Sequence, residues 1–204
     1  MAKLQLTDDL FLGDGNHKKV WIHPGDEHLC VKVVFREPDE DLEREFGYRR
    51  ALGSRAEQMP LLTKYLGEAD TSEGRGYIFE RIIDYDGSSS PTLLSLLEHC
   101  AGEGTEKEKS RLLRILQDFH REFLAERFFA AGMDPDNFLV QRVSPTEDRV
   151  RIIDNIGTSA RLPLEYYVDF LARKRAEKYW RIFMEELCRD YPELMTEAWQ
   201  KELR

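Results

Sequence analysis

Three features are scarce in this chain of 204 residues, and each scarcity argues against a class of protein. Cysteine is the first: Cys30, Cys100 and Cys188 lie far apart and form no Cys-x-x-Cys pair, so neither a disulfide framework nor a thiolate zinc site is predicted. Long apolar runs are the second, and without one no segment spans a bilayer. Residues 1–9 also lack the apolar core of a signal peptide, so we expect a cytoplasmic protein without membrane contact.

An excess of basic charge is the third missing feature. The chain has 39 acidic and 30 basic side chains, which gives a net charge of −9. Non-specific binding to nucleic acid needs a basic surface, so we expect no nucleic-acid partner. The hydrophobic fraction of 41% is ordinary for a globular protein, and the length suffices for two small lobes around a shared core.

The hydrophobic patterns predict an α+β fold whose two halves differ. The first half predicts three strands in an antiparallel meander, one amphipathic helix and two further strands, at residues 10–12, 18–23, 29–35, 40–52, 61–67 and 76–83. We expect residues 68–75 to form the loop between the last two strands. The Gly- and Ser-rich stretch 84–90 marks the boundary between an N-terminal lobe, residues 1–84, and a mostly helical C-terminal lobe, residues 85–204.

In the second half, Ser90 followed by Pro91 predicts the cap and first turn of a helix that runs to about Cys100. Further helices are expected at residues 107–126, 164–188 and 192–203, with a β-hairpin between the first two of these.

Two oxygen-bearing side chains frame this hairpin. Asn137 opens its first strand and Asp154 closes its second, so both are expected at one mouth of a small sheet. Mg²⁺ prefers such ligands and takes the rest of its shell from water and phosphates. The pair therefore predicts an Mg²⁺ site of the kind that holds a nucleotide in phosphoryl-transfer proteins.

Features of the first half fit a nucleotide site as well. Gly13 and Gly15 lie on a turn where backbone amides can approach phosphate, although most such turns are only tight turns. Lys32 is the one charged residue in the strand of residues 29–35, and it is either a solvent-facing residue or a phosphate ligand. We predict that Glu45 on the following helix pairs with Lys32, and Glu43 is its rival because helix phase is uncertain.

The order of these motifs resembles the protein-kinase-like fold, including its aminoglycoside-phosphotransferase relatives. Residues 13–20 look like the glycine-rich loop, with Lys18 at the place of the third glycine, and residues 30–32 look like the lysine strand. The matches to the gatekeeper and hinge, the end of the catalytic loop, and the metal-binding Asp lie at residues 79–82, 135–140 and 153–157. The resemblance implies a compact fold with a five-stranded antiparallel sheet and one helix in its N-lobe. It also implies that the hinge backbone around Glu80 and Ile82 meets the adenine of ATP.

A closer resemblance covers nearly the whole chain. Residues 12–20, 23–26, 76–87 and 154–157 are similar to the bacterial YrbL family, whose members are labelled as proteins of the PhoP regulatory network. Family members are kinase-like by fold, and no established reaction comes with the name. The resemblance implies a regulatory role, in which a protein partner is expected beside the nucleotide.

The kinase pattern fails at the catalytic base. The position five residues before Asn137 is Gly132, and glycine cannot accept or orient the proton of an acceptor hydroxyl. Asp134 is the candidate substitute, and its alternative reading is a turn residue before Pro135. Two hypotheses follow: a regulatory, pseudokinase-like protein that binds ATP and Mg²⁺, or an atypical ATP-dependent phosphotransferase with Asp134 as base, acting on a small molecule or a protein.

Overall fold

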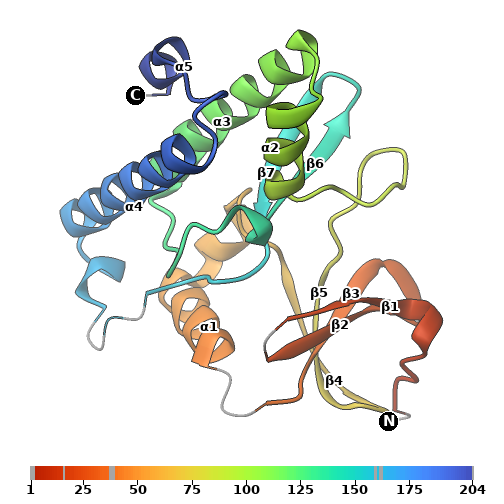
Figure 1. Ribbon diagram of the computed structural model, residues 1–204. Helices are drawn as coiled ribbons and strands as arrows, with labels where there is room; N and C mark the ends of the chain where they lie inside the picture. Colours follow the sequence, from red (N-terminus) through yellow and green to blue (C-terminus); the bar gives the residue numbers. More distant parts are fainter. Residues whose placement is uncertain (1–2, 16, 37–39, 159, 161–162, 204) are drawn as a thin grey trace.

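The computed structural model describes residues 3–15, 17–36, 40–158, 160 and 163–203 (Figure 1). The first half contains β1 (Phe11–Asp14), β2 (Lys18–His23), β3 (Asp26–Val34), α1 (Glu40–Leu52), β4 (Tyr65–Thr71) and β5 (Gly74–Glu80). The second half contains α2 (Leu93–Gly102), α3 (Glu106–Glu126), β6 (Phe138–Ser144), β7 (Glu147–Ile152), α4 (Asp169–Asp190) and α5 (Glu197–Glu202). Short 3-10 helices lie at η1 (Asp8–Leu10), η2 (Gly53–Gln58), η3 (Pro135–Asn137) and η4 (Leu164–Tyr166). The predicted α+β organisation, a five-stranded β-rich lobe and a mostly helical lobe, is confirmed.

The large sheet is antiparallel throughout, with strand order β1-β2-β3-β5-β4. Side chains alternate across β3, as in any strand. Val31 and Val33 pack with Trp21 on one face, whereas Cys30 packs with Phe79 and Leu42 on the face covered by α1. Lys32 lies two residues after Cys30, so the pleat places it on the same face and away from the outer cluster. Its Nζ reaches the carbonyl of Ile153, just after β7.

The β4–β5 hairpin differs from the prediction. Residues 68–75 were expected as a loop, but β4 continues to Thr71 and β5 begins at Gly74, which leaves a two-residue turn. Gly74 has φ +121°, a value that L side chains rarely adopt, and the Thr71 hydroxyl donates to the Gly74 carbonyl at 2.8 Å. Glu68 and Asp70 occupy the exposed positions of β4 and alternate with the half-buried Gly67 and Ala69, as expected for one face of an extended ladder.

Three helix starts also differ from the prediction. Thr92, not Ser90, caps α2, and its hydroxyl accepts the N–H of Ser95. The Ser90 hydroxyl instead donates to the buried Asp84 carboxylate at 2.6 Å. Helix α4 begins at Asp169, because the residues that were predicted as its first turn form η4. The last helix, α5, is shorter than predicted and begins after its cap Thr196.

The main core lies in the helical lobe and anchors the small hairpin. Phe119 of α3 packs edge-on against Phe138 at 5.2 Å and Trp180 at 5.5 Å between ring centroids. Because Phe138 and Ile152 are fully buried, the ends of β6 and β7 are fixed where they face the large sheet. In the described part of the chain, no helix is long and apolar enough to cross a membrane.

Candidate functional site

A cleft of about 700 Å³ lies between the large sheet and the small hairpin. This volume is in the range of pockets that hold small molecules and cofactors, about 300–1,000 Å³. The cleft brings together eight residues that the sequence singled out: Gly13, Gly15, Lys32, Glu80, Ile82, Asp134, Asn137 and Asp154. Glu45 is the one selected residue that does not line it.

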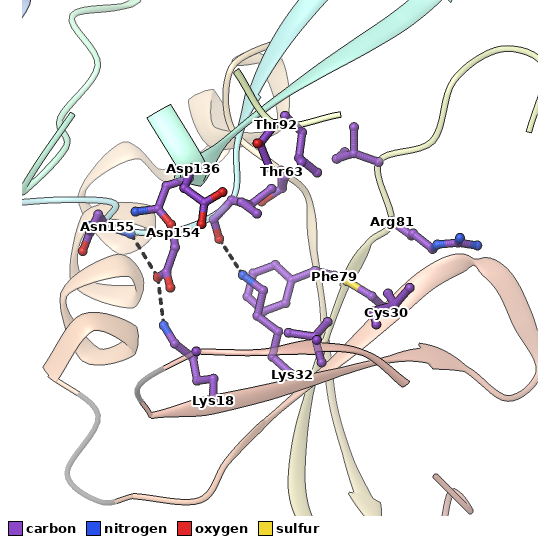
Figure 2. A pocket seen from close by; sticks show the side chains of 18 of the residues that line it. Lys18, Cys30, Lys32, Thr63, Phe79, Arg81, Thr92, Asp136, Asp154 and Asn155 are labelled. Carbon is purple, nitrogen blue, oxygen red and sulfur yellow. Dashed lines mark hydrogen bonds and ion pairs between the residues drawn. The ribbon is translucent and has the colours of Figure 1, made fainter. Parts of the chain in front are cut away.

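Lys32 lies at the base of the cleft with its ammonium group turned toward the end of β7 (Figure 2). Its Nζ donates to the carbonyl of Ile153 at 2.6 Å and lies 4.4 Å from the centre of the Phe79 ring. Only 8% of the residue is exposed. The solvent-facing alternative for Lys32 is therefore wrong, and its charge is directed at the residue next to Asp154.

Asp154 directly follows the buried end of β7 and accepts two hydrogen bonds. Its Oδ1 accepts from Lys18 Nζ at 2.8 Å and from the backbone N–H of Asn155 at 2.9 Å (Figure 2). Burial alone raises the pKa of this carboxyl, but the charges of Lys32 and Lys18 lower it, and the net result is a lowered pKa. Asp154 is thus a carboxylate held between two ammonium groups.

The predicted ion pair between Lys32 and Glu45 is wrong. Glu45 is buried on α1, and its Oε1 accepts from Arg49 Nε at 2.8 Å and from Arg49 Nη2 at 2.5 Å. Arg49 lies one helical turn after Glu45 on the same face of α1, and side chains at this i,i+4 spacing are neighbours that can pair. The rival Glu43 is exposed.

Asn137 is the last residue of η3, and its backbone is tied to the other strand of the hairpin. The Asn137 carbonyl accepts from Ile153 N–H at 3.0 Å, which brings the two predicted metal ligands close together in the fold. Among the described residues, the side-chain amide of Asn137 makes no hydrogen bond, so it is available to a ligand in the cleft.

Asp134 is exposed on the cleft wall and caps η3. Its carboxylate accepts the backbone N–H of Asp136 at 3.0 Å, which is the turn role that the sequence offered as the alternative to a catalytic base. At Gly132 an added Cβ would meet only Asn155 Nδ2, at 3.9 Å. The backbone therefore leaves room for a Cβ at the position where a kinase has its base.

The segment predicted as the hinge lines the opposite wall. The Glu80 carboxylate accepts the N–H of Lys64 at 2.6 Å and forms an ion pair with Arg151 of β7. The Arg81 N–H donates to the His28 carbonyl at 2.7 Å. Neither backbone group of Ile82 makes a hydrogen bond with the described residues, which leaves a donor and an acceptor at the cleft edge.

Sequence reasoning missed several cleft residues. Lys18 was recognised only as a departure from the glycine pattern, although a lysine that begins a strand of buried residues carries a weak signal of a buried partner. Other lining residues that were not selected are Thr63, Ser90, Thr92, Asp136 and Asn155. Each is a common polar residue in a loop or turn, and no local spacing marks it as part of a site. Asn16, inside the predicted glycine-rich turn, lies outside the described residues.

Comparisons with known proteins show a family and include a distant structural likeness. The family described as PhoP regulatory network protein YrbL matches residues 4–188. Proteins called "Uncharacterized protein YrbL" from Escherichia coli (strain K12) and Shigella flexneri are each 30% identical over 184 residues, which covers 89% of this chain and 86% of theirs. A crystal structure of a kinase domain is similar with a TM-score of 0.43 and 16% identity, over 76% of this chain and 52% of that domain.

Proposed function

The chain belongs to the YrbL family of PhoP regulatory network proteins, and from this premise we propose that it is a kinase-like regulatory protein that binds ATP or another nucleotide in its cleft. One observation carries the proposal: Lys32, Asn137 and Asp154 come from separate parts of the chain and converge on one cleft of about 700 Å³. Two ammonium groups and an amide without an internal partner suit a polyphosphate.

Each end of the cleft supports a part of the nucleotide. Adenine fits the wall at Ile82, where a backbone donor and acceptor lie beside the apolar Val20 and Leu139. Phosphates fit the end lined by Gly13, Gly15 and Lys32, where the glycines place no side chain in the way and a buried ammonium provides positive potential.

Mg²⁺ requires a closer test of the donor set. Asn137 and Asp154 are the residues that would hold it, and a phosphate-bound Mg²⁺ needs few protein ligands. No group of three or more His, Cys, Asp or Glu residues among the described residues is arranged to hold a metal ion. The Asp154 Oδ1 already accepts from Lys18, so Mg²⁺ would have to bind Oδ2, next to the Lys18 ammonium, or displace Lys18 from Oδ1. When bound, the ion would supply charge neutralisation for the phosphates.

A regulatory role follows from Gly132. Without a carboxylate at this position, the site retains groups that bind a nucleotide and lacks the group that orients an acceptor hydroxyl. A protein partner that reads the nucleotide-bound state would complete the regulatory role.

Thermal unfolding with ATP tests nucleotide binding. A ligand at a hundred times its dissociation constant stabilises the folded state by about 2.7 kcal/mol, which for a chain of this size raises Tm by roughly 5–10 °C. We expect this shift in the wild type, its loss in Lys32→Met, and its retention in Lys19→Met, because the Lys19 ammonium lies by the Phe35 ring outside the cleft. Absence of any shift with ATP, GTP and their Mg²⁺ complexes would refute the proposal.

The second candidate function is an atypical phosphotransferase that uses Asp134 as base, acting on a small molecule or a protein. Its support is the exposed position of Asp134 on the cleft wall. ATP turnover that disappears in Asp134→Asn would favour this candidate. The regulatory proposal predicts no turnover in the wild type and a gain in Gly132→Asp, since the nearest atom outside the chain neighbours to an added Cβ is Asn155 Nδ2 at 3.9 Å.

A further inference from the structure

Lys18 brings a second buried charge into the cleft. It is the first residue of β2, is 7% exposed, and places its Nζ 2.8 Å from Asp154 Oδ1 (Figure 2). The bond joins the edge of the large sheet to the small hairpin across 136 positions of sequence. A buried ammonium is expensive to desolvate and persists only where a specific partner compensates it.

The two cleft lysines approach the same short segment from neighbouring strands. Lys18 of β2 contacts the Asp154 carboxylate, and Lys32 of β3 contacts the carbonyl of the preceding Ile153. Two positive charges therefore face one carboxylate at the end of the cleft where a metal and polyphosphate are expected.

An ammonium and a divalent cation compete for the same carboxylate. Mg²⁺ needs an anionic oxygen as ligand, and the Asp154 Oδ1 already accepts from Lys18 and from the Asn155 N–H. A divalent cation at Oδ2 of the same carboxylate would lie next to the Lys18 ammonium and be repelled by its charge. An ammonium has three N–H donors in a compact group, so this type of cation bridges a carboxylate and a phosphate oxygen as a metal ion does.

We propose that Lys18 takes the place of Mg²⁺ at Asp154, so that the cleft accepts the polyphosphate of a nucleoside triphosphate in its metal-free form. The inference rests on the proposed nucleotide-binding function and specifies the form of its ligand. Lys18 and Lys32 together neutralise the phosphates, and Mg²⁺ becomes a competitor for Asp154 rather than a requirement.

Equilibrium titration of the full chain with ATP, in EDTA and in excess Mg²⁺, tests the inference by calorimetry. The wild type should bind ATP in EDTA at least as tightly as it binds the Mg²⁺ complex. In Lys18→Met, metal-free affinity should fall by about tenfold or more, the worth of a hydrogen bond between charged groups, while Mg²⁺–ATP affinity is kept. The variant should thus require Mg²⁺.

Two further variants provide controls. Lys18→Arg keeps a cation at this position and should behave like the wild type in EDTA. Lys19→Met removes the same charge from the next residue, whose ammonium lies 5.8 Å from the centre of the Phe35 ring, and should leave the ratio of the two affinities unchanged. Urea denaturation of each variant identifies any loss of folding. The comparison of wild-type ATP affinity in EDTA and in excess Mg²⁺ does not depend on any variant, so it tests the inference even if a variant fails to fold.

The outcomes separate the inference from the function beneath it. If the wild type binds only the Mg²⁺ complex, the inference is wrong while the proposed nucleotide-binding function stands. If Lys18→Met binds metal-free ATP as tightly as the wild type does, the inference is also wrong. If the wild type binds neither form, the proposed function itself is refuted.

Discussion

The buried pair of Glu45 and Arg49 provides a quantitative test of the fold around the cleft. Glu45 is 1% exposed, and its Oε1 accepts from Arg49 Nε at 2.8 Å and from Arg49 Nη2 at 2.5 Å. Arg49 also donates to the Thr63 carbonyl at 2.6 Å and so ties α1 to the segment before β4. We expect Arg49→Met to lower the free energy of unfolding by about 3–5 kcal/mol, because it leaves the Glu45 charge buried without its partner.

The matched double variant isolates the pair. In Glu45→Met with Arg49→Met, no unpaired charge remains, and replacing a buried ion pair by apolar side chains of similar volume is often neutral or stabilising by about 1–4 kcal/mol. Loss of the hydrogen bond to Thr63 offsets about 0.5–1.5 kcal/mol of that gain. The double variant should therefore lie close to the wild type in stability.

Urea denaturation of the wild type, both single variants and the double variant gives the coupling energy. We expect a coupling energy of about 2 kcal/mol or more between Glu45 and Arg49, at the upper end for residues in contact. The same cycle made with Glu45 and Lys32 should give a smaller coupling energy. An Arg49→Met variant within about 1 kcal/mol of the wild type would contradict this reasoning. Stronger coupling of Glu45 to Lys32 than to Arg49 would restore the ion pair that the sequence predicted.

Three other substitutions test local features of the fold. Burial raises the pKa of Glu126 from 4.5 to about 7, so the free energy of unfolding of the wild type falls as pH rises between these values. Glu126→Gln lacks this titration and should gain stability relative to the wild type over that window, as measured by urea denaturation at several pH values. Gly76→Ala should cost about 1–3 kcal/mol, because its Cβ would lie 2.6 Å from Val31 Cγ1, whereas Gly102→Ala, with open space, should cost far less in the same assay. Thr105→Ala removes the capping box of α3 and should lower thermal stability by about 1 kcal/mol.

The elements with strong local signals were predicted well. The predicted bounds of α1 agree with the observed Glu40–Leu52, since its first turn is acidic and Gly53, with φ +57°, ends the helix. The α3 stripe of Leu112, Leu116 and Phe119 is buried as its spacing indicated. In each case the signal lies within a few residues of the structure that it specifies.

Errors arose where the choice of partner, and not the residue's own chemistry, decides the outcome. Ser90 has the chemistry of a helix cap, but the buried Asp84 carboxylate takes its hydroxyl, so Thr92 caps α2 instead. Glu45 has a suitable partner within its own helix, which a pattern borrowed from a kinase could not reveal. The site residues Asn137 and Asp154 were found because each closes or opens a strand, whereas the role of Lys18 depends on a contact between opposite lobes.

The long sequence separation of the Lys18–Asp154 contact has a kinetic consequence. The hairpins of both lobes close short loops, but this contact joins residues 136 positions apart and forms only after both lobes have folded and docked. A ligand that bridges the two lobes therefore stabilises interactions that are absent from the folding transition state. Such a ligand slows unfolding and leaves the folding rate nearly unchanged, so the time for which the cleft stays closed would depend on its occupancy.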